Sequence, residues 1–139
     1  MRFWDSSAVV PLLVDEEASP LRVRQLEADA VMLVWWETAV ECASALERLV
    51  REGGLDAAGT RAAMVRLREL EKHWNEVEPT QQVRSQAERL LRLHPLRAAD
   101  ALQLAAAIIA ADYEPKGLTF VTADERLAVA AAKEGFEVI

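Results

Sequence analysis

The chain has 139 residues and a net charge of −7, with 23 acidic side chains against 16 basic ones. This length fits a single domain over residues 1–139, and the acidic balance argues against a basic coat for binding nucleic acid. The only cysteine, Cys42, excludes an internal disulfide and a cysteine-based zinc cluster. No signal-peptide hydrophobic region follows Met1, and no apolar run is long enough to span a bilayer. We therefore expect a cytoplasmic protein that does not enter the membrane.

Short apolar runs alternate with longer helical patterns along the chain. The runs that predict strands are residues 2–4, 31–34, 74–77, 118–121 and 136–138. The patterns that predict helices are residues 8–14, 20–28, 36–51, 56–72, 80–93, 97–111 and 124–133. This alternation predicts an α/β fold with a small, mostly parallel sheet covered by helices on both faces.

The predicted helix of residues 97–111 is almost wholly apolar. Only Arg97, Asp100 and Gln103 are polar before Asp112, so we expect a helix buried nearly all round. An acid in such a helix needs a partner, because burying an unpaired charge is costly. Arg97 is the only structural partner nearby. Because few groups other than a ligand could offset the burial of its charge, Asp100 is a candidate functional residue.

Carboxylates follow several of the predicted strands. Asp5 follows the first strand, Glu37 and Glu41 open the helix after the second, and Asp124 opens the last helix. Asp100 lies in the first turn of the apolar helix. Because a parallel open sheet binds ligands beyond the carboxyl ends of its strands, we expect these acids at one edge.

Acids brought together repel one another, and burial raises that cost. A divalent cation relieves the repulsion, and ligation by oxygen alone favours Mg²⁺ or Mn²⁺ over zinc. Such an ion activates water and neutralises charge on a phosphate. The pattern therefore favours metal-dependent hydrolysis of phosphodiester bonds.

Each acid also has a purely structural interpretation. Asp5 is suited to cap the helix that follows it, and Asp124 is suited to be a first-turn acid that favours the helix dipole. Glu37 and Glu41 lie one turn apart on the same side of their helix, where either could be a solvated surface residue. Periodicity does not choose between these two glutamates.

Four segments in order resemble the PIN-domain nucleases, and among them the VapC toxins of prokaryotic toxin–antitoxin pairs. They are Asp-Ser-Ser-Ala-Val-Val at 5–10, Glu-Cys-Ala-Ser-Ala-Leu at 41–46, Leu-Arg-Ala-Ala-Asp-Ala-Leu-Gln-Leu-Ala at 96–105, and Phe-Val-Thr-Ala-Asp-Glu-Arg-Leu at 120–127. The resemblance covers essentially the whole chain. It implies a PIN-like three-layer α/β/α domain that cleaves RNA as an endoribonuclease.

The resemblance also implies the site. The four acids that would hold one or two Mg²⁺ or Mn²⁺ ions and carry catalysis are Asp5, Glu41, Asp100 and Asp124. Ser6 and Thr122 fall where the family often uses a hydroxyl to orient a carboxylate or a metal-bound water. Gln103 stands where many relatives have histidine. Implied partners are an RNA substrate, a VapB-type antitoxin and a second copy of the chain in a homodimer.

The sequence also offers other candidate surfaces and an alternative function. Trp35 and Trp36 are suited to a protein contact but are more typical of core. Six arginines on predicted helices are candidates for contacting the RNA backbone, although most such residues are ordinary surface: Arg48, Arg51, Arg84, Arg89, Arg92 and Arg97. The alternative function is a non-catalytic PIN-like or receiver-like module for protein binding or signalling. A receiver-like domain needs its acid after a middle strand and a late partnering lysine, a pattern that this sequence lacks.

Overall fold

Five parallel strands form the centre of the computed structural model, which describes all 139 residues. They are β1 (Arg2–Trp4), β2 (Met32–Trp35), β3 (Asn75–Val77), β4 (Thr119–Val121) and β5 (Glu137–Val138). Their order across the sheet is β3-β2-β1-β4-β5, so the first strand is central. In the register, Phe3 lies beside Leu33 on one side and Phe120 on the other. Every strand pair is parallel, as the alternation of elements predicts.

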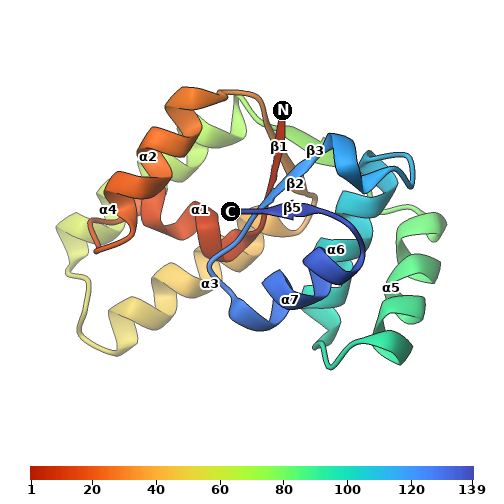
Figure 1. Cartoon of the computed structure of the whole chain (residues 1–139). Helices are drawn as coiled ribbons and strands as arrows, with labels where there is room; N and C mark the ends of the chain where they lie inside the picture. The colour runs from red at the N-terminus through yellow and green to blue at the C-terminus, as the bar shows by residue number, and fades with distance from the viewer.

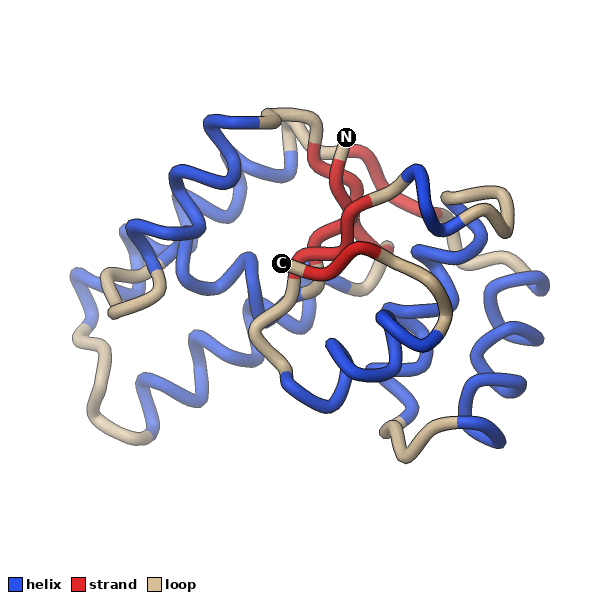
Figure 2. The backbone as a smooth tube through the Cα atoms, viewed as in Figure 1, coloured by secondary structure: helices blue, strands red, loops and turns tan.

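Helices cover both faces of this sheet (Figures 1 and 2). They are α1 (Ser6–Leu13), α2 (Ser19–Ala28), α3 (Thr38–Arg51), α4 (Ala57–Glu71), α5 (Gln81–Leu93), α6 (Ala98–Ala110) and α7 (Glu125–Lys133), with the short 3-10 helix η1 (Pro115–Gly117) before β4. Helices α5, α6 and α7 lie on one face, and α1, α3 and α4 lie on the other, with α2 against α1. The three-layer α/β/α arrangement is confirmed. No helix has the length and apolar character needed to cross a membrane.

Neighbouring residues of β1 supply two separate cores. Phe3 packs with α6 on one face, and its ring stacks on Phe120 with 5.3 Å between the ring centroids. Trp4 packs on the other face with α1 and α3, in a core that includes the fully buried Cys42. Successive strand residues point to opposite faces, so a strand buried on both sides is apolar throughout. Packing on both faces fixes the carboxyl end of β1, where Asp5 follows.

Most helices begin one residue later than their patterns predict, because the residue before the helix is its cap. The side chains of Asp56, Thr80 and Asp124 each accept a hydrogen bond from a main-chain N–H in the first turn. Asp5 does the same for α1, which therefore begins at Ser6 rather than at the predicted residue 8. Capping oxygens satisfy N–H groups that have no partner within a helix.

Two expectations about burial are wrong. The first turn of α6 is open to solvent, with Ala98 and Ala99 exposed and Asp100 only half-buried, because this turn borders an open pocket. Asp100 also accepts a hydrogen bond from the Arg97 main-chain N–H at 3.3 Å, so its burial cost is smaller than the sequence suggests. Trp36 is 51% exposed whereas Trp35 is 5% exposed. The strand ends at Trp35, so the chain turns away from the core at the second tryptophan.

Candidate active site

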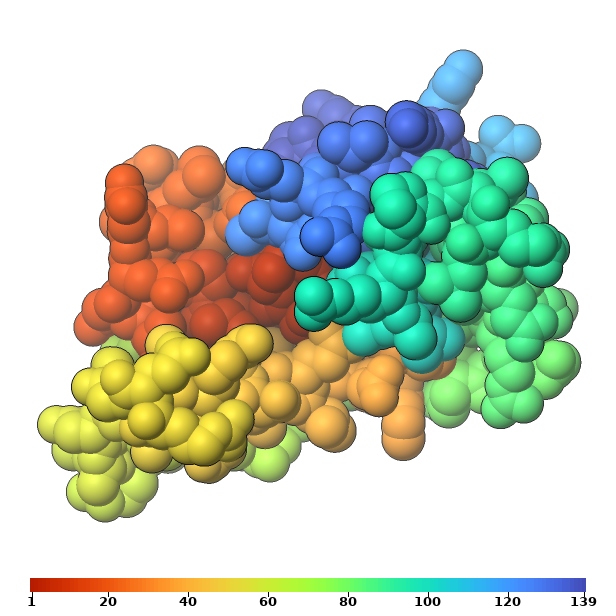
Figure 3. Space-filling view, turned by 90° about the horizontal axis from the view of Figure 1, so that it is seen from below, coloured from red at the N-terminus to blue at the C-terminus, as the bar shows by residue number.

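The carboxyl ends of the strands and the first turns of four helices meet at one edge of the sheet. Figure 3 looks onto this edge, where the start of α1 in red lies beside the starts of α6 in teal and α7 in blue, with α3 in orange and yellow below. Each of these segments carries one of the four predicted acids, in the positions Asp5, Glu41, Asp100 and Asp124. The topology therefore brings the four acid-bearing segments to a common edge.

Asp5 is the most buried of the four acids, with 3% of its surface exposed. Its Oδ2 accepts hydrogen bonds from the Ser7 main-chain N–H at 3.2 Å, from the Ser7 hydroxyl, and from the Thr122 hydroxyl at 2.9 Å. Burial raises the pKa of Asp5 above its ordinary value, although these hydrogen bonds oppose the shift, and the charge of Asp100 raises it further. The bonds occupy Oδ2, and Oδ1 has only the Ser6 hydroxyl at 3.5 Å.

Glu41 lies beside Asp5 and is joined to it by Ser6. The Ser6 hydroxyl donates to Glu41 Oε2 at 2.5 Å, and the Gln103 amide donates to the same oxygen at 3.1 Å. Burial raises the pKa of Glu41, opposed by these two hydrogen bonds, and the negative charge of Asp5 adds to the rise. Glu41 Oε1 is buried without any hydrogen-bond partner. Glu37, by contrast, accepts a 3.4 Å bond from the Trp35 indole.

The other two acids contact the cluster less directly. Asp100 acts on Asp5 through its charge, and its own Oδ2 accepts from the main chain of α6. Asp124 Oδ1 accepts from the Leu127 main-chain N–H at 2.8 Å, which is the capping contact. The Asp124 main-chain N–H donates to the Thr122 hydroxyl at 3.0 Å, and that hydroxyl in turn donates to Asp5. Thr122 thus joins the start of α7 to Asp5.

The donor set at this edge fits a hard divalent cation in chemistry. All its candidate ligands are carboxylate oxygens, and hard ions prefer such ligands. The buried Glu41 Oε1 lacks the partner that a buried oxygen requires, and an ion would provide one. No group of three or more acids, histidines or cysteines is close enough in this structure to form a complete metal-binding set. Asp5 and Glu41 are the two carboxylates that the contacts bring together.

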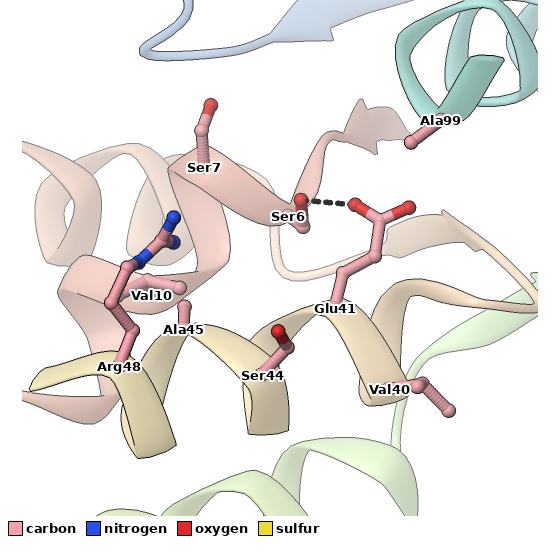
Figure 4. A pocket seen from close by; sticks show the side chains of 9 residues that line it. All are labelled: Ser6, Ser7, Val10, Val40, Glu41, Ser44, Ala45, Arg48 and Ala99. Atoms are coloured by element: carbon pink, nitrogen blue, oxygen red, sulfur yellow. Dashed lines mark hydrogen bonds between the residues drawn. The ribbon is translucent and has the colours of Figure 1, made fainter. Parts of the chain in front are cut away.

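A pocket of about 510 Å³ opens beside Glu41 (Figure 4). Its polar lining comes from α1 and α3, in the side chains of Ser6, Ser7, Glu41, Ser44 and Arg48. The apolar part of the lining is Val10, Val40, Ala45 and Ala99. Ala99 lies in the first turn of α6, next to Asp100. The pocket therefore gives a ligand access to the edge where the acids meet.

Three residues that the sequence does not single out for this role support the site. The Ser7 hydroxyl contacts Asp5 and accepts from the Ala123 main-chain N–H at 2.9 Å. Gln103, only 1% exposed, holds Glu41. Arg22, 5% exposed, donates to the Thr122 main-chain carbonyl at 2.7 Å. The available signal for Gln103 was its polarity within an apolar helix. Arg22 gave no such signal, because its burial depends on a contact with Thr122, which is far away in the sequence.

Several solved structures share the fold of this chain. PAE2754 from Pyrobaculum aerophilum is 19% identical over 93% of this chain and 83% of its own, with a TM-score of 0.67. A toxin–antitoxin complex from Klebsiella pneumoniae gives 16% identity and a TM-score of 0.64, covering 100% of this chain and 96% of its own. FitAcB from Neisseria gonorrhoeae is 16% identical with a TM-score of 0.68, covering 100% of this chain and 96% of its own. A search of curated proteins gives no significant match.

The fold and the edge define a class of protein: a parallel α/β domain in which acid-bearing segments meet where the strands end. The family model described as the PIN domain matches residues 2–133, which is nearly the whole chain. The chain belongs to the PIN domain family, and the fold expected from the four sequence segments is confirmed.

Proposed function

We propose that this chain, as a domain over residues 1–139, is a metal-dependent endoribonuclease and the toxin of a VapBC-type toxin–antitoxin pair, acting in the cytoplasm. Membership of the PIN family, whose domains are generally metal-dependent nucleases, supports the nuclease class. The observation that carries the proposal is the contact of Asp5 and Glu41 through Ser6, with Glu41 Oε1 unpartnered beside an open pocket. Glu41 lines the pocket, together with Ser6 and Ser7, which contact Asp5.

In this proposal Asp5, Glu41, Asp100 and Asp124 hold Mg²⁺ or Mn²⁺. When bound, the ion supplies a nucleophilic water and neutralises charge on the phosphate. Ser7 and Thr122 hold Asp5 through Oδ2 and leave Oδ1 toward Ser6. Ser6 and Gln103 fix the orientation of Glu41 from two sides. Such supporting bonds matter because ligands must be held in place before the ion or substrate arrives.

We also propose two protein partners. A VapB-type antitoxin is supported by the solved toxin–antitoxin complex from Klebsiella pneumoniae, whose fold this chain shares. A second copy of the chain, forming a homodimer, has an exposed aromatic surface available at Trp36. Mass measurement of the chain alone and of its complex with a candidate antitoxin tests both proposals.

The decisive experiment is a cleavage assay on single-stranded and structured RNA with Mn²⁺ or Mg²⁺, compared with excess chelator. We expect wild-type cleavage that requires metal, and loss of at least a hundredfold in rate for Asp5→Asn. Asparagine remains a good helix cap, so we expect that variant to keep its fold. The matched control is Asp15→Asn, which changes an exposed acid away from the pocket. Metal-independent cleavage, or full activity in Asp5→Asn, would overturn the proposal.

A further inference from the structure

A polar stripe runs along α3 from the acids into the pocket. Glu41, Ser44 and Arg48 are spaced three and four residues apart, which places them on one face of the helix. All three line the pocket, and Figure 4 shows the Arg48 side chain reaching across it toward Ser7 and Val10 on α1. Seven residues of helix separate Glu41 from Arg48 by roughly 10 Å along the axis. The stripe thus begins with an acid of the site and ends with a cation.

Arg48 differs from the other candidate arginines in two respects. It is the only positively charged side chain that lines this pocket, and it makes no ion pair or hydrogen bond within the chain. Arg89, in contrast, pairs with Glu134, and Arg84 donates to Gln81. Arg51 lies on the same helix but does not line the pocket. Arg48 is therefore the arginine whose guanidinium is free to meet a ligand at the site.

The ligand that fits this cation is an anion that extends from the acids along α3. The chain carries a net charge of −7, and such a charge repels a polyanion from the acidic edge. A guanidinium presents several N–H donors in a plane that suits two phosphate oxygens, and a nearby serine hydroxyl adds another donor. Ser44 lies one turn from Arg48 on the same face and has no hydrogen-bond partner of its own in the chain.

We propose that Arg48 and Ser44 form a subsite for a backbone phosphate of the RNA strand that flanks the phosphate being cleaved. This inference rests on the proposed ribonuclease function and adds how the strand is held. The subsite contacts phosphate rather than base, so it contributes binding without selecting the sequence. It sets the strand along α3, with the scissile phosphate at the Glu41 end of the pocket.

The first test compares Arg48→Gln with Arg51→Gln, which removes the same charge from the same helix outside the pocket. We expect Arg48→Gln to raise KM for a single-stranded RNA about tenfold with little change in kcat, and Arg51→Gln to match the wild type. Loss of one phosphate contact should lower the dependence of log(1/KM) on log salt concentration by about 0.7. Arg48→Lys should recover part of the affinity, since a lysine keeps the charge without the fork.

The second test replaces single phosphates of the RNA by neutral methylphosphonates. We expect one position beside the cleaved bond at which the neutral group weakens RNA binding by the wild type. At the same position, it should not weaken RNA binding by Arg48→Gln any further. Equal KM values for Arg48→Gln and the wild type, or equal losses of both proteins at every position, would overturn the subsite. A wild type that cleaves no RNA with metal present would instead refute the proposed function, so the two failures are distinguishable.

Discussion

At the scale of single residues, Asp5 shows why a cap and a ligand are not competing roles. Its Oδ2 caps α1 and accepts the Thr122 hydroxyl, which holds the carboxyl group in one orientation. Oδ1 is left with a single 3.5 Å contact to Ser6. The sequence alone offers these roles as alternatives, because a capping pattern names a residue and not which oxygen is used. The same carboxylate serves the helix with one oxygen and faces the cluster with the other.

Gln103 provides a prediction at this scale. Its amide donates to both Glu41 at 3.1 Å and Thr38 at 3.2 Å, so it holds the glutamate from the side of α6. We expect Gln103→Met, which keeps the volume but removes the donor, to weaken Mn²⁺ binding about 10- to 100-fold, as losing a group that orients a ligand typically does. Isothermal titration of the folded protein with Mn²⁺ measures the change.

The matched control is Gln86→Met, which alters another buried glutamine, on α5 and away from the acids. We expect its Mn²⁺ affinity to equal that of the wild type. Unchanged affinity in Gln103→Met would show that the amide only fills space between α3 and α6.

At the scale of elements, helix α7, which Asp124 caps, is anchored at its far end. Glu134 follows α7 and contacts His94 at 2.7 Å and Arg89, both from the α5 segment. Burial raises the pKa of Glu134, but the hydrogen bonds from His94 and Arg89 lower it by more, so the net pKa is below its ordinary value. This contact joins α5 to the end of α7 on one face of the sheet.

A lowered pKa means that the unfolded chain binds more protons than the folded chain as the solution becomes acidic. The stabilisation from Glu134 is therefore complete above about pH 4.5, the ordinary value, and is lost as the pH falls through the lower folded pKa. We expect Glu134→Gln to lower the free energy of unfolding by roughly 1 kcal/mol at pH 7. Below about pH 4.5, the free energy of unfolding of this variant should fall less with decreasing pH than that of the wild type. Urea unfolding between pH 7 and pH 3 measures both effects.

Glu88→Gln is the control for this prediction, because Glu88 is an exposed acid on α5 without a partner. It should follow the wild type at every pH. Parallel pH profiles for Glu134→Gln and the wild type would contradict a stabilising role for the contact.

At the scale of the whole molecule, the alternation of elements was enough to predict the architecture. The three central strands β2, β1 and β4 are largely buried between helices on both faces, as expected for a parallel sheet, whereas the edge strands β3 and β5 are more exposed. The burial of particular residues was less predictable. Apolar periodicity describes the neighbours within a helix, whereas the exposure of Asp100 depends on how the first turn of α6 lies against the rest of the molecule. Arg22 likewise depends on a contact between α2 and the end of β4, far apart in sequence.

Binding of an ion at the edge should stabilise the molecule as a whole, since the unfolded chain does not bring the acids together. We expect Mn²⁺ at ten times its dissociation constant to add about 1.4 kcal/mol to the free energy of unfolding. For a domain of this size, that raises the Tm by roughly 4–6 °C. Thermal unfolding with Mn²⁺ and with chelator measures the shift, and Asp5→Asn should show little of it. An equal shift in both proteins would place the ion elsewhere.

The reactivity of the buried Cys42 reports on the opening of the core beside this site. The thiol follows Glu41 directly in α3, is fully buried, and has its pKa raised by burial and by the charges of Glu41 and Asp5. Both effects keep it from reacting while the core around it is closed. As the only cysteine in the chain, it reacts with an alkylating reagent only when α3 separates from its neighbours. The labelling rate therefore measures how often this half of the molecule opens, and a ligand that holds α3 in place will slow it.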